Sequence, residues 1–106
     1  MATRRRTKAA AKVTFSRYDS ADYLNTEEDM AAYLAACFEE APDDPAYIAE
    51  AIGTVARAHG MMKLAKKTGL TREGLYKALS KDGNPSLGTI LKVIHALGLK
   101  LTPSAA

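Results

Sequence analysis

Residues 61–79 of this 106-residue chain, MMKLAKKTGLTREGLYKAL, determine how the rest of the sequence can be interpreted. They predict two short helices around a tight turn at Gly69, where the absence of a Cβ permits a positive φ. Thr71 follows the turn and can cap the second helix. Apolar residues able to face a common core recur through both helices, namely Leu64, Leu70, Leu75 and Ala78. This pattern is typical of a helix-turn-helix, which places its second helix in the DNA major groove.

The polar face of the second predicted helix provides candidates for reading DNA bases. They are Thr71, Arg72, Glu73, Tyr76 and Lys77. Arg72 can bond bidentately to guanine N7 and O6, and Glu73 can accept from cytosine N4 or orient Arg72. Tyr76 can contact a thymine methyl or a phosphate, whereas Lys77 suits a phosphate. The alternative for each residue is a solvated face of an ordinary helical hairpin.

Phosphate contacts are expected from helix ends that flank the motif, because polar side chains and unpaired backbone N–H groups there bind anions. The candidates are Lys63, Lys66, Asn84, Ser86 and Thr89. Other basic residues, Lys67, Lys81 and Lys92, carry charge that solvent alone can satisfy.

Two glycines fall inside predicted helices. Gly74 lies in the second helix of the motif, where glycine costs about 1 kcal/mol relative to alanine. We therefore expect a close approach at Gly74, either by a neighbouring helix or by DNA. Gly53 lies in the centre of an earlier helix and is expected to permit close helix packing.

The remaining sequence predicts further helices, so the fold class is all-α: a small five-helix bundle containing the helix-turn-helix, with an N-terminal arm. Thr26 and Asp29 resemble a capping box at the start of the first helix. Its apolar stripe comprises Met30, Tyr33, Leu34, Cys37 and Phe38. Asp44 caps a second helix and Pro45 takes its first position. The stripe of that helix comprises Ile48, Ile52, Val55 and His59, and Gly60 ends it.

The last predicted helix begins after the turn cluster KDGNP at residues 81–85, with Ser86 as its cap. One face carries Leu87, Ile90, Leu91, Ile94 and Leu97. Gly98 ends the helix. Leu99 and Leu101 then alternate with a lysine, a short pattern that can pair as an edge strand.

Charge divides the chain into three parts despite a net charge of only +3. Residues 1–12 hold five basic residues and no acid; residues 13–50 hold ten acids and one arginine; residues 51–106 hold nine basic residues and two acids. The basic last part suits phosphates, and the acidic middle suits a basic protein.

The same composition predicts the domain organisation. Residues 1–14 are expected to form a basic disordered tail and residues 15–106 a single helical domain. Within that domain we expect an arm and first helix over residues 15–41 and a DNA-binding core over residues 45–101.

Several functional classes find no support in the sequence. The lone Cys37 cannot form an intramolecular disulfide, which fits a reducing cytosol, and its expected role is that of a small buried residue. His59 and His95 lack metal-ligand spacing, so no metal and no cofactor are expected. No apolar run approaches the length of a membrane span, and no paired catalytic groups are visible, so we expect a cytoplasmic protein that is not an enzyme.

Residues 18–101 resemble the addiction-module antidote proteins of the Xre/Cro-like helix-turn-helix superfamily. The most specific blocks are AAYL at residues 31–34, VARAHGM at 55–61, and GLTREGLYKALS at 69–80 followed by GNPS at 83–86. The chain departs from the pattern in its basic tail and in EEAPDDP at residues 39–45, where the family often has a shorter turn.

This resemblance implies a bacterial antitoxin paired with a small basic toxin of the RelE/ParE superfamily. Such a protein would neutralise the toxin and repress its own operon by binding operator DNA. The aromatic and acidic residues before and within the first helix are then expected to contact the toxin. They are Phe15, Tyr18, Asp19, Asp22, Tyr23, Leu24, Glu27 and Glu28. Alternatively, the apolar ones cover this chain's own bundle and the acids are solvated.

A homodimer is expected because repressors of this type read two half-sites about one helical turn apart. The last helix with an exposed Val93, or a strand shared through residues 99–101, is one expected interface, and the N-terminal part is the rival. Two alternative functions stay open: a stand-alone Xre/Cro-like regulator without a toxin, and an interaction module that no longer binds DNA.

Overall fold

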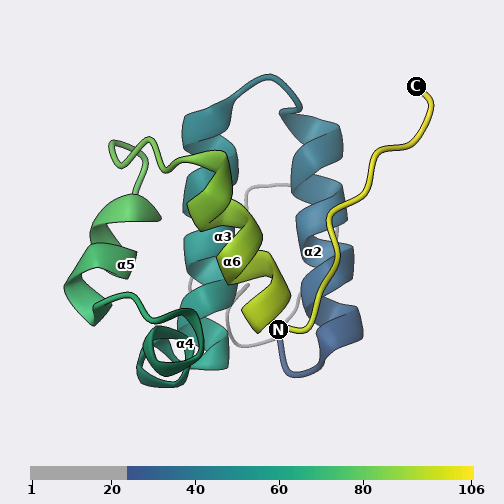
Figure 1. Ribbon diagram of the computed structural model, residues 1–106. Coiled ribbons are helices and arrows are strands. Elements are labelled where there is room, and N and C mark those ends of the chain that lie inside the picture. The colour runs from purple at the N-terminus through teal and green to yellow at the C-terminus, as the bar shows by residue number, and fades with distance from the viewer. Residues whose placement is uncertain (1–23) are drawn as a thin grey trace, which may run out of the picture.

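The computed structural model describes residues 24–106, and this part of the chain contains five α-helices and no strand (Figure 1). They are α2 (Glu27–Glu40), α3 (Pro45–His59), α4 (Met61–Thr68), α5 (Arg72–Ala78) and α6 (Leu87–Ala96). The predicted all-α, five-helix fold is therefore confirmed for the described residues. Leu99 and Leu101, which could pair as an edge strand, form none within the described chain, since residues 99–106 are neither helix nor strand.

Part of the sequence-based interpretation lies outside the described residues. The predicted basic tail falls there, with five of the eight residues expected to contact a toxin. Those five are Phe15, Tyr18, Asp19, Asp22 and Tyr23. Their roles stay predictions.

Local capping fixes where the first two described helices begin. The Thr26 hydroxyl accepts from the backbone N–H of Asp29 at 3.0 Å. The Asp29 carboxylate reaches back to the backbone N–H of Asn25, at 3.4 Å. Helix α3 begins in the same way, because the Asp44 carboxylate accepts from the N–H of Tyr47 at 3.1 Å. Both predicted caps are confirmed.

Helix α3 runs through the centre of the bundle (Figure 1) and is buried continuously over residues 51–56. Its Ile52 and Val55 have no exposed surface. Helices α2 and α4 both pack on α3, and α4 in turn contacts α5 and α6. The α4–α5 pair is thus attached to the core mainly through α4, and α5 lies at the edge of the molecule.

Gly53 allows α3 to approach the end of α5 closely. A Cβ built on Gly53 would lie only 2.5 Å from the carbonyl oxygen of Leu79, a residue that is itself 3% exposed. Backbone atoms cannot move aside as a flexible side chain can, so a larger residue at this position would separate the two elements. The expected close packing at Gly53 is confirmed.

The last helix differs from its prediction at two positions. Val93 is completely buried, so it cannot be the exposed contact expected for a dimer. Leu87, expected on the buried face, is instead 67% exposed. The reason is that α6 buries a stripe that includes Val93 and Ile94, while Leu87 occupies the first position of the helix, beyond the turns that the core covers.

Candidate nucleic-acid interface

The turn between α4 and α5 has the conformation that the sequence predicts. Gly69 ends α4 with φ 76°, in the left-handed region, and its N–H donates to the carbonyl of Ala65 at 2.9 Å. Thr71 then adopts an extended conformation and caps α5, accepting from the N–H of Gly74 at 2.9 Å. Two short helices joined by residues 69–71 are consistent with a helix-turn-helix.

Apolar side chains fix how α5 is rotated. Leu75 has no exposed surface and points into the core, and Leu64 of α4 is equally buried. Leu70 and Ala65 pack against the same core between the two helices. Because one face of α5 is held inward by Leu75, the opposite face is set outward.

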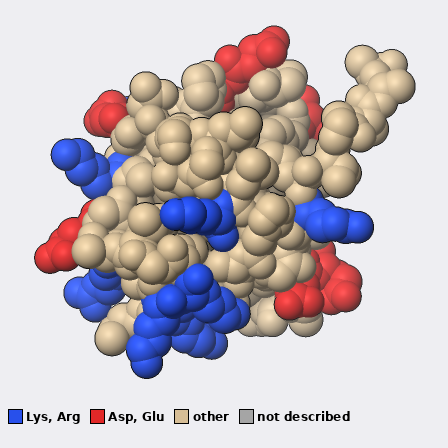
Figure 2. Space-filling model, in the orientation of Figure 1, with Lys and Arg blue, Asp and Glu red and all other residues tan. Residues whose placement is uncertain are grey.

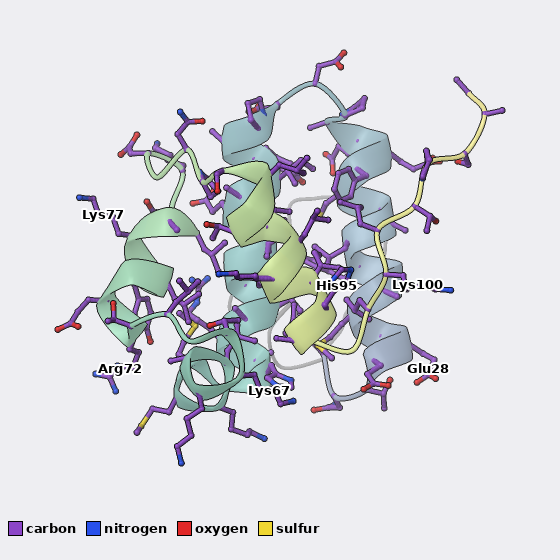
Figure 3. The ribbon with its side chains drawn as sticks, in the orientation of Figure 1. Glu28, Lys67, Arg72, Lys77, His95 and Lys100 are labelled. Atoms are coloured by element: carbon purple, nitrogen blue, oxygen red, sulfur yellow. The ribbon has the colours of Figure 1, made fainter. Side chains whose placement is uncertain are left out.

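That outward face carries the predicted base-reading residues. Arg72, Glu73 and Lys77 are exposed, and Tyr76 is 47% exposed. Figure 3 shows Arg72 and Lys77 directed away from the body of the molecule, on the side where α5 lies. Thr71 is also exposed, but its hydroxyl already accepts the capping hydrogen bond.

Gly74 lies on this same exposed helix. A Cβ built there would meet the Thr71 hydroxyl oxygen at 2.8 Å and nothing else nearby outside its own helix backbone. The expected approach of a neighbouring helix is therefore wrong. The glycine leaves room for the capping hydroxyl and keeps the outer surface of α5 free of a side chain at this point.

Helix α4 contributes a concentrated basic surface. Lys63 and Lys66 are exposed on it, as a role in binding phosphates requires. Figure 2 shows Lys and Arg side chains gathered at the end of the molecule where α4 lies. Lys67, expected to be only solvated, donates to the carbonyl of Ala96 at 3.4 Å and so helps to satisfy the C-terminal end of α6.

The segment between α5 and α6 carries the other predicted phosphate-binding residues. Asn84 is exposed and has φ 46°, the left-handed region. Ser86 caps α6: its hydroxyl oxygen accepts from the N–H of Thr89 and donates to the Thr89 hydroxyl, both at 3.1 Å. A Cβ built on Gly83 would overlap the carbonyl groups of Lys77 and Ala78, so this segment lies against the end of α5.

These three groups of residues lie on elements that adjoin one another. The α4 lysines, the outward side chains of α5 and the segment that follows α5 belong to one continuous part of the chain, and each contacts the next. Sequence reasoning missed Met62, which is 68% exposed beside Lys63. Helical periodicity could have found it, since Met62 follows the buried Met61 and precedes the buried Leu64 by two positions.

His59 lies near the junction of α3 and α4. Its Nε2 atom is buried and has no hydrogen-bond partner. Burial lowers the pKa of this imidazole, as do the nearby charges of Lys67 and Lys63, while Glu27 of α2 acts in the opposite direction. The uncharged form of His59 is therefore favoured beside the basic surface of α4.

The acidic part of the molecule lies on other elements. Residues 24–56, which include α2 and most of α3, contain eight acids and no lysine or arginine. Glu28 is exposed at the start of α2 (Figure 3), and Glu27 is exposed nearby with its carboxylate against Gly98. Leu24 is only 7% exposed and belongs to the core, which favours the covering role over a toxin contact for this residue.

Cys37 of α2 and Tyr47 of α3 both have raised pKa values. Cys37 is buried, and burial raises the pKa of its thiol, which keeps it protonated and unreactive. Tyr47 donates to the Glu40 carboxylate at 3.0 Å, and its pKa is raised by burial and by that hydrogen bond. No cluster of three potential metal ligands occurs within residues 24–106.

None of the described helices has the length and apolarity to cross a membrane.

Comparison with known proteins assigns the chain to a family. The model of a family described as probable addiction module antidote protein matches residues 14–105. The chain belongs to this family. An uncharacterized protein of Haemophilus influenzae (strain ATCC 51907 / DSM 11121 / KW20 / Rd) is 43% identical over 83 residues, which cover 78% of this chain and 84% of that protein. No solved structure matches the antidote.

Family membership gives the surfaces described above a context. An addiction module pairs an antidote with a toxin, so this antidote has a toxin as its counterpart.

Proposed function

We propose that this antidote represses its own operon by inserting α5 into the major groove of operator DNA. The observation that carries the proposal is the outward face of α5, where Arg72, Tyr76 and Lys77 are exposed while Leu75 anchors the opposite side. Lys63 and Lys66 on α4 would contact the phosphate backbone on one side of α5. Asn84, Ser86 and Thr89 would do so on the other.

The protein would bind DNA as a homodimer, because a single α5 of seven residues reaches few base pairs. Because Val93 is buried, two candidate dimer interfaces are to be tested. One is the partly exposed face of α6 together with the residues that follow it. The other is the N-terminal part of the chain. Sedimentation of the free protein and of its DNA complex measures the stoichiometry directly.

We further propose that the acidic half of the molecule binds and neutralises a small basic toxin of the RelE/ParE type, in a type II toxin–antitoxin module of the bacterial cytoplasm. Charge complementarity supports this assignment, since residues 24–56 carry eight acids and no basic side chain. Glu27 and Glu28 would take part, together with the residues predicted before position 24.

A gel-shift titration with a duplex of the gene's own promoter tests the DNA-binding half. We expect binding that weakens steeply with salt and exceeds binding to a scrambled duplex. If the dimer binds neither duplex at low salt, with and without its toxin, repression by this protein is refuted.

Expression of the gene together with its operon neighbours tests the toxin-binding half. We expect a small basic protein to copurify and to be identified by mass spectrometry. A stand-alone Xre/Cro-like regulator is the alternative function, and the same exposed face of α5 supports it. Specific promoter binding without any copurifying partner would favour that alternative.

A further inference from the structure

Arg57 is an exposed arginine on the side of α3 that faces the end of α5. Its Nη1 atom lies 3.4 Å from the point where a Cβ on Gly53 would be, and the carbonyl oxygen of Leu79 lies 2.5 Å from the same point. Leu79 is the residue that ends α5. The guanidinium carried by α3 therefore lies beside the C-terminal end of the helix proposed to enter DNA.

A buried hydroxyl holds this guanidinium in place. Nη2 of Arg57 donates to the hydroxyl of Thr54 at 3.3 Å, and that hydroxyl donates to the carbonyl of Glu50, also at 3.3 Å. Thr54 is 1% exposed and is the one buried polar side chain of residues 24–106. An arginine restrained in this way loses less rotamer freedom when it binds a ligand than a freely moving one.

Most hydrogen-bond donors of Arg57 are free for a ligand. A guanidinium carries several N–H donors. The hydrogen bond to Thr54 uses one of them, and no carboxylate within the described part of the chain pairs with Arg57. A planar, permanently charged group with unused donors matches the oxygen atoms of a phosphate.

The same end of α5 also adjoins the segment that leads to α6. A Cβ on Gly83 would overlap the carbonyl groups of Lys77 and Ala78, so this segment packs against the last turn of α5. The predicted phosphate-binding residues that follow Gly83 are uncharged: Asn84, Ser86 and Thr89. Arg57 approaches this end of α5 from α3 and adds a positive charge to it.

We propose that Arg57 binds a backbone phosphate of operator DNA beside the end of α5, and that Thr54 positions its guanidinium for this contact. The inference rests on the proposed binding of α5 to DNA and adds a residue from outside the helix-turn-helix to that interface. The contact adds affinity without sequence preference, because phosphates carry no direct sequence information.

Arg57→Gln in the full-length protein tests the phosphate contact. Affinity for the promoter duplex is measured from about 50 to 200 mM salt, and we expect the slope of log K against log salt to become shallower by about 0.9. Affinity for a scrambled duplex should fall by the same factor. Lys100→Gln is the matched control for charge removal and should keep the parental slope. Lys100 is exposed and lies on the opposite side of the molecule from Arg72 and Lys77 (Figure 3).

Thr54→Val tests the positioning role, because valine keeps the shape of threonine and removes the hydroxyl. We expect the parental salt slope with an affinity lowered by about 2- to 10-fold, since Arg57 would then be ordered only on binding. In the Arg57→Gln background the same change should cause no further loss of affinity. Circular dichroism shows whether each variant folds. Arg57→Met or Thr54→Ala gives the same comparison if the first choice does not.

The outcomes separate this inference from the proposed function. If the parental protein binds the promoter and Arg57→Gln keeps its salt slope, the contact is refuted while DNA binding by α5 stands. A loss confined to the promoter duplex also overturns it, because Arg57 would then read a base. An equal loss from Thr54→Val with and without Arg57 refutes the positioning role. Failure of the parental protein to bind DNA removes the proposed function itself.

Discussion

Arg72 is the first residue of α5 and the side chain from which base recognition is most directly expected. Its guanidinium is exposed, and the cap at Thr71 fixes the helix end that carries it. A planar guanidinium can donate two parallel hydrogen bonds to guanine, which no other exposed side chain of α5 can do.

Replacing Arg72 with alanine should therefore weaken operator binding by about 1–3 kcal/mol and relax specificity at one base pair. The measurement is a set of duplexes in which each operator position is changed in turn. Lys77→Ala is the control, and we expect it to weaken binding to all duplexes alike. An equal loss on specific and random DNA for Arg72→Ala would make Arg72 a phosphate contact.

Gly53 is important for packing because it has no Cβ. Gly53→Ala should destabilise the fold by about 1–3 kcal/mol, because the added methyl group would overlap the Leu79 carbonyl. Gly88→Ala is the matched control, since a Cβ there meets only the Ser86 hydroxyl at 3.8 Å. Gly88→Ala should stabilise the fold by up to about 1 kcal/mol, because alanine has a higher helix propensity than glycine. Urea unfolding of both variants shows whether their effects have opposite signs.

The sequence predicted more at some residues than at others. Gly69 and Thr71 were predictable because a turn and a cap depend on neighbours only a few residues away. At Gly74 the sequence indicated a close approach by a neighbouring helix or by DNA, but not the contact within the described chain. That contact is with the Thr71 hydroxyl, which lies 2.8 Å from where a Cβ would be and whose position depends on the rotamer of Thr71.

Helix α5 has only seven residues, so the cap at Thr71 helps to fix where the helix lies. Thr71→Ala removes the acceptor for the Gly74 N–H and should cost about 1 kcal/mol of stability. Thr71→Ser keeps a hydroxyl and should retain most of it. Chemical unfolding measures the stability, and hydrogen exchange at the start of α5 shows whether the loss is local. Equal stability of the alanine and serine variants would mean that the cap contributes nothing.

His59, near the junction of α3 and α4, should make the free energy of unfolding depend on pH. Burial lowers the pKa of His59 in the folded state below its ordinary value of 6.5, so the unfolded chain binds a proton more readily. The contribution of uncharged His59 to the stability of the fold is complete above about pH 6.5. It is lost as the pH falls from there through the folded-state pKa.

His59→Gln should therefore make the free energy of unfolding less dependent on pH over that acidic range. His95→Gln, at an exposed position on α6, is the control and should retain the parental dependence. Denaturant unfolding at a series of pH values gives the comparison. A parental dependence that persists in the His59 variant would assign it to other groups.

Element boundaries were largely predictable, whereas the packing of elements was not. Thr26, Asp44 and Ser86 begin their helices as predicted, because each supplies a side-chain acceptor to a nearby N–H. The burial of Val93 and the exposure of Leu87 were missed. Both depend on how far the neighbouring helices extend along α6, which periodicity within α6 does not report.

For the molecule as a whole, the separation of charge supports the proposal of two distinct binding surfaces. Glu28→Lys places a positive charge on the acidic half and should reduce the amount of basic toxin that copurifies, mainly through slower association. Asp82→Lys makes the same charge change at an exposed position between α5 and α6 and should leave toxin binding intact. Equal toxin recovery from both variants would place the toxin site elsewhere.

The candidate site was predictable in outline but not in its boundaries. Spacing placed Arg72, Tyr76 and Lys77 on an exposed face, because Leu75 had to be buried. The burial of Leu24 was left open between two roles, since an isolated leucine before a helix can cover its own core or a partner's. Membership of the antidote family then indicated a toxin as the partner, which no residue pattern in this chain specifies alone.

The glycines at positions 53 and 83 have a consequence for how this protein can diverge. Each allows backbone atoms of two segments to lie close together at the end of α5, because a Cβ at either position would overlap a carbonyl group there. In a library randomised across the gene and selected only for folding, both positions should tolerate substitution as poorly as Leu64. The outward positions of α5 should vary freely in the same library. Under the proposed function, new operator preferences can therefore evolve by exchange of surface residues on an unchanged scaffold.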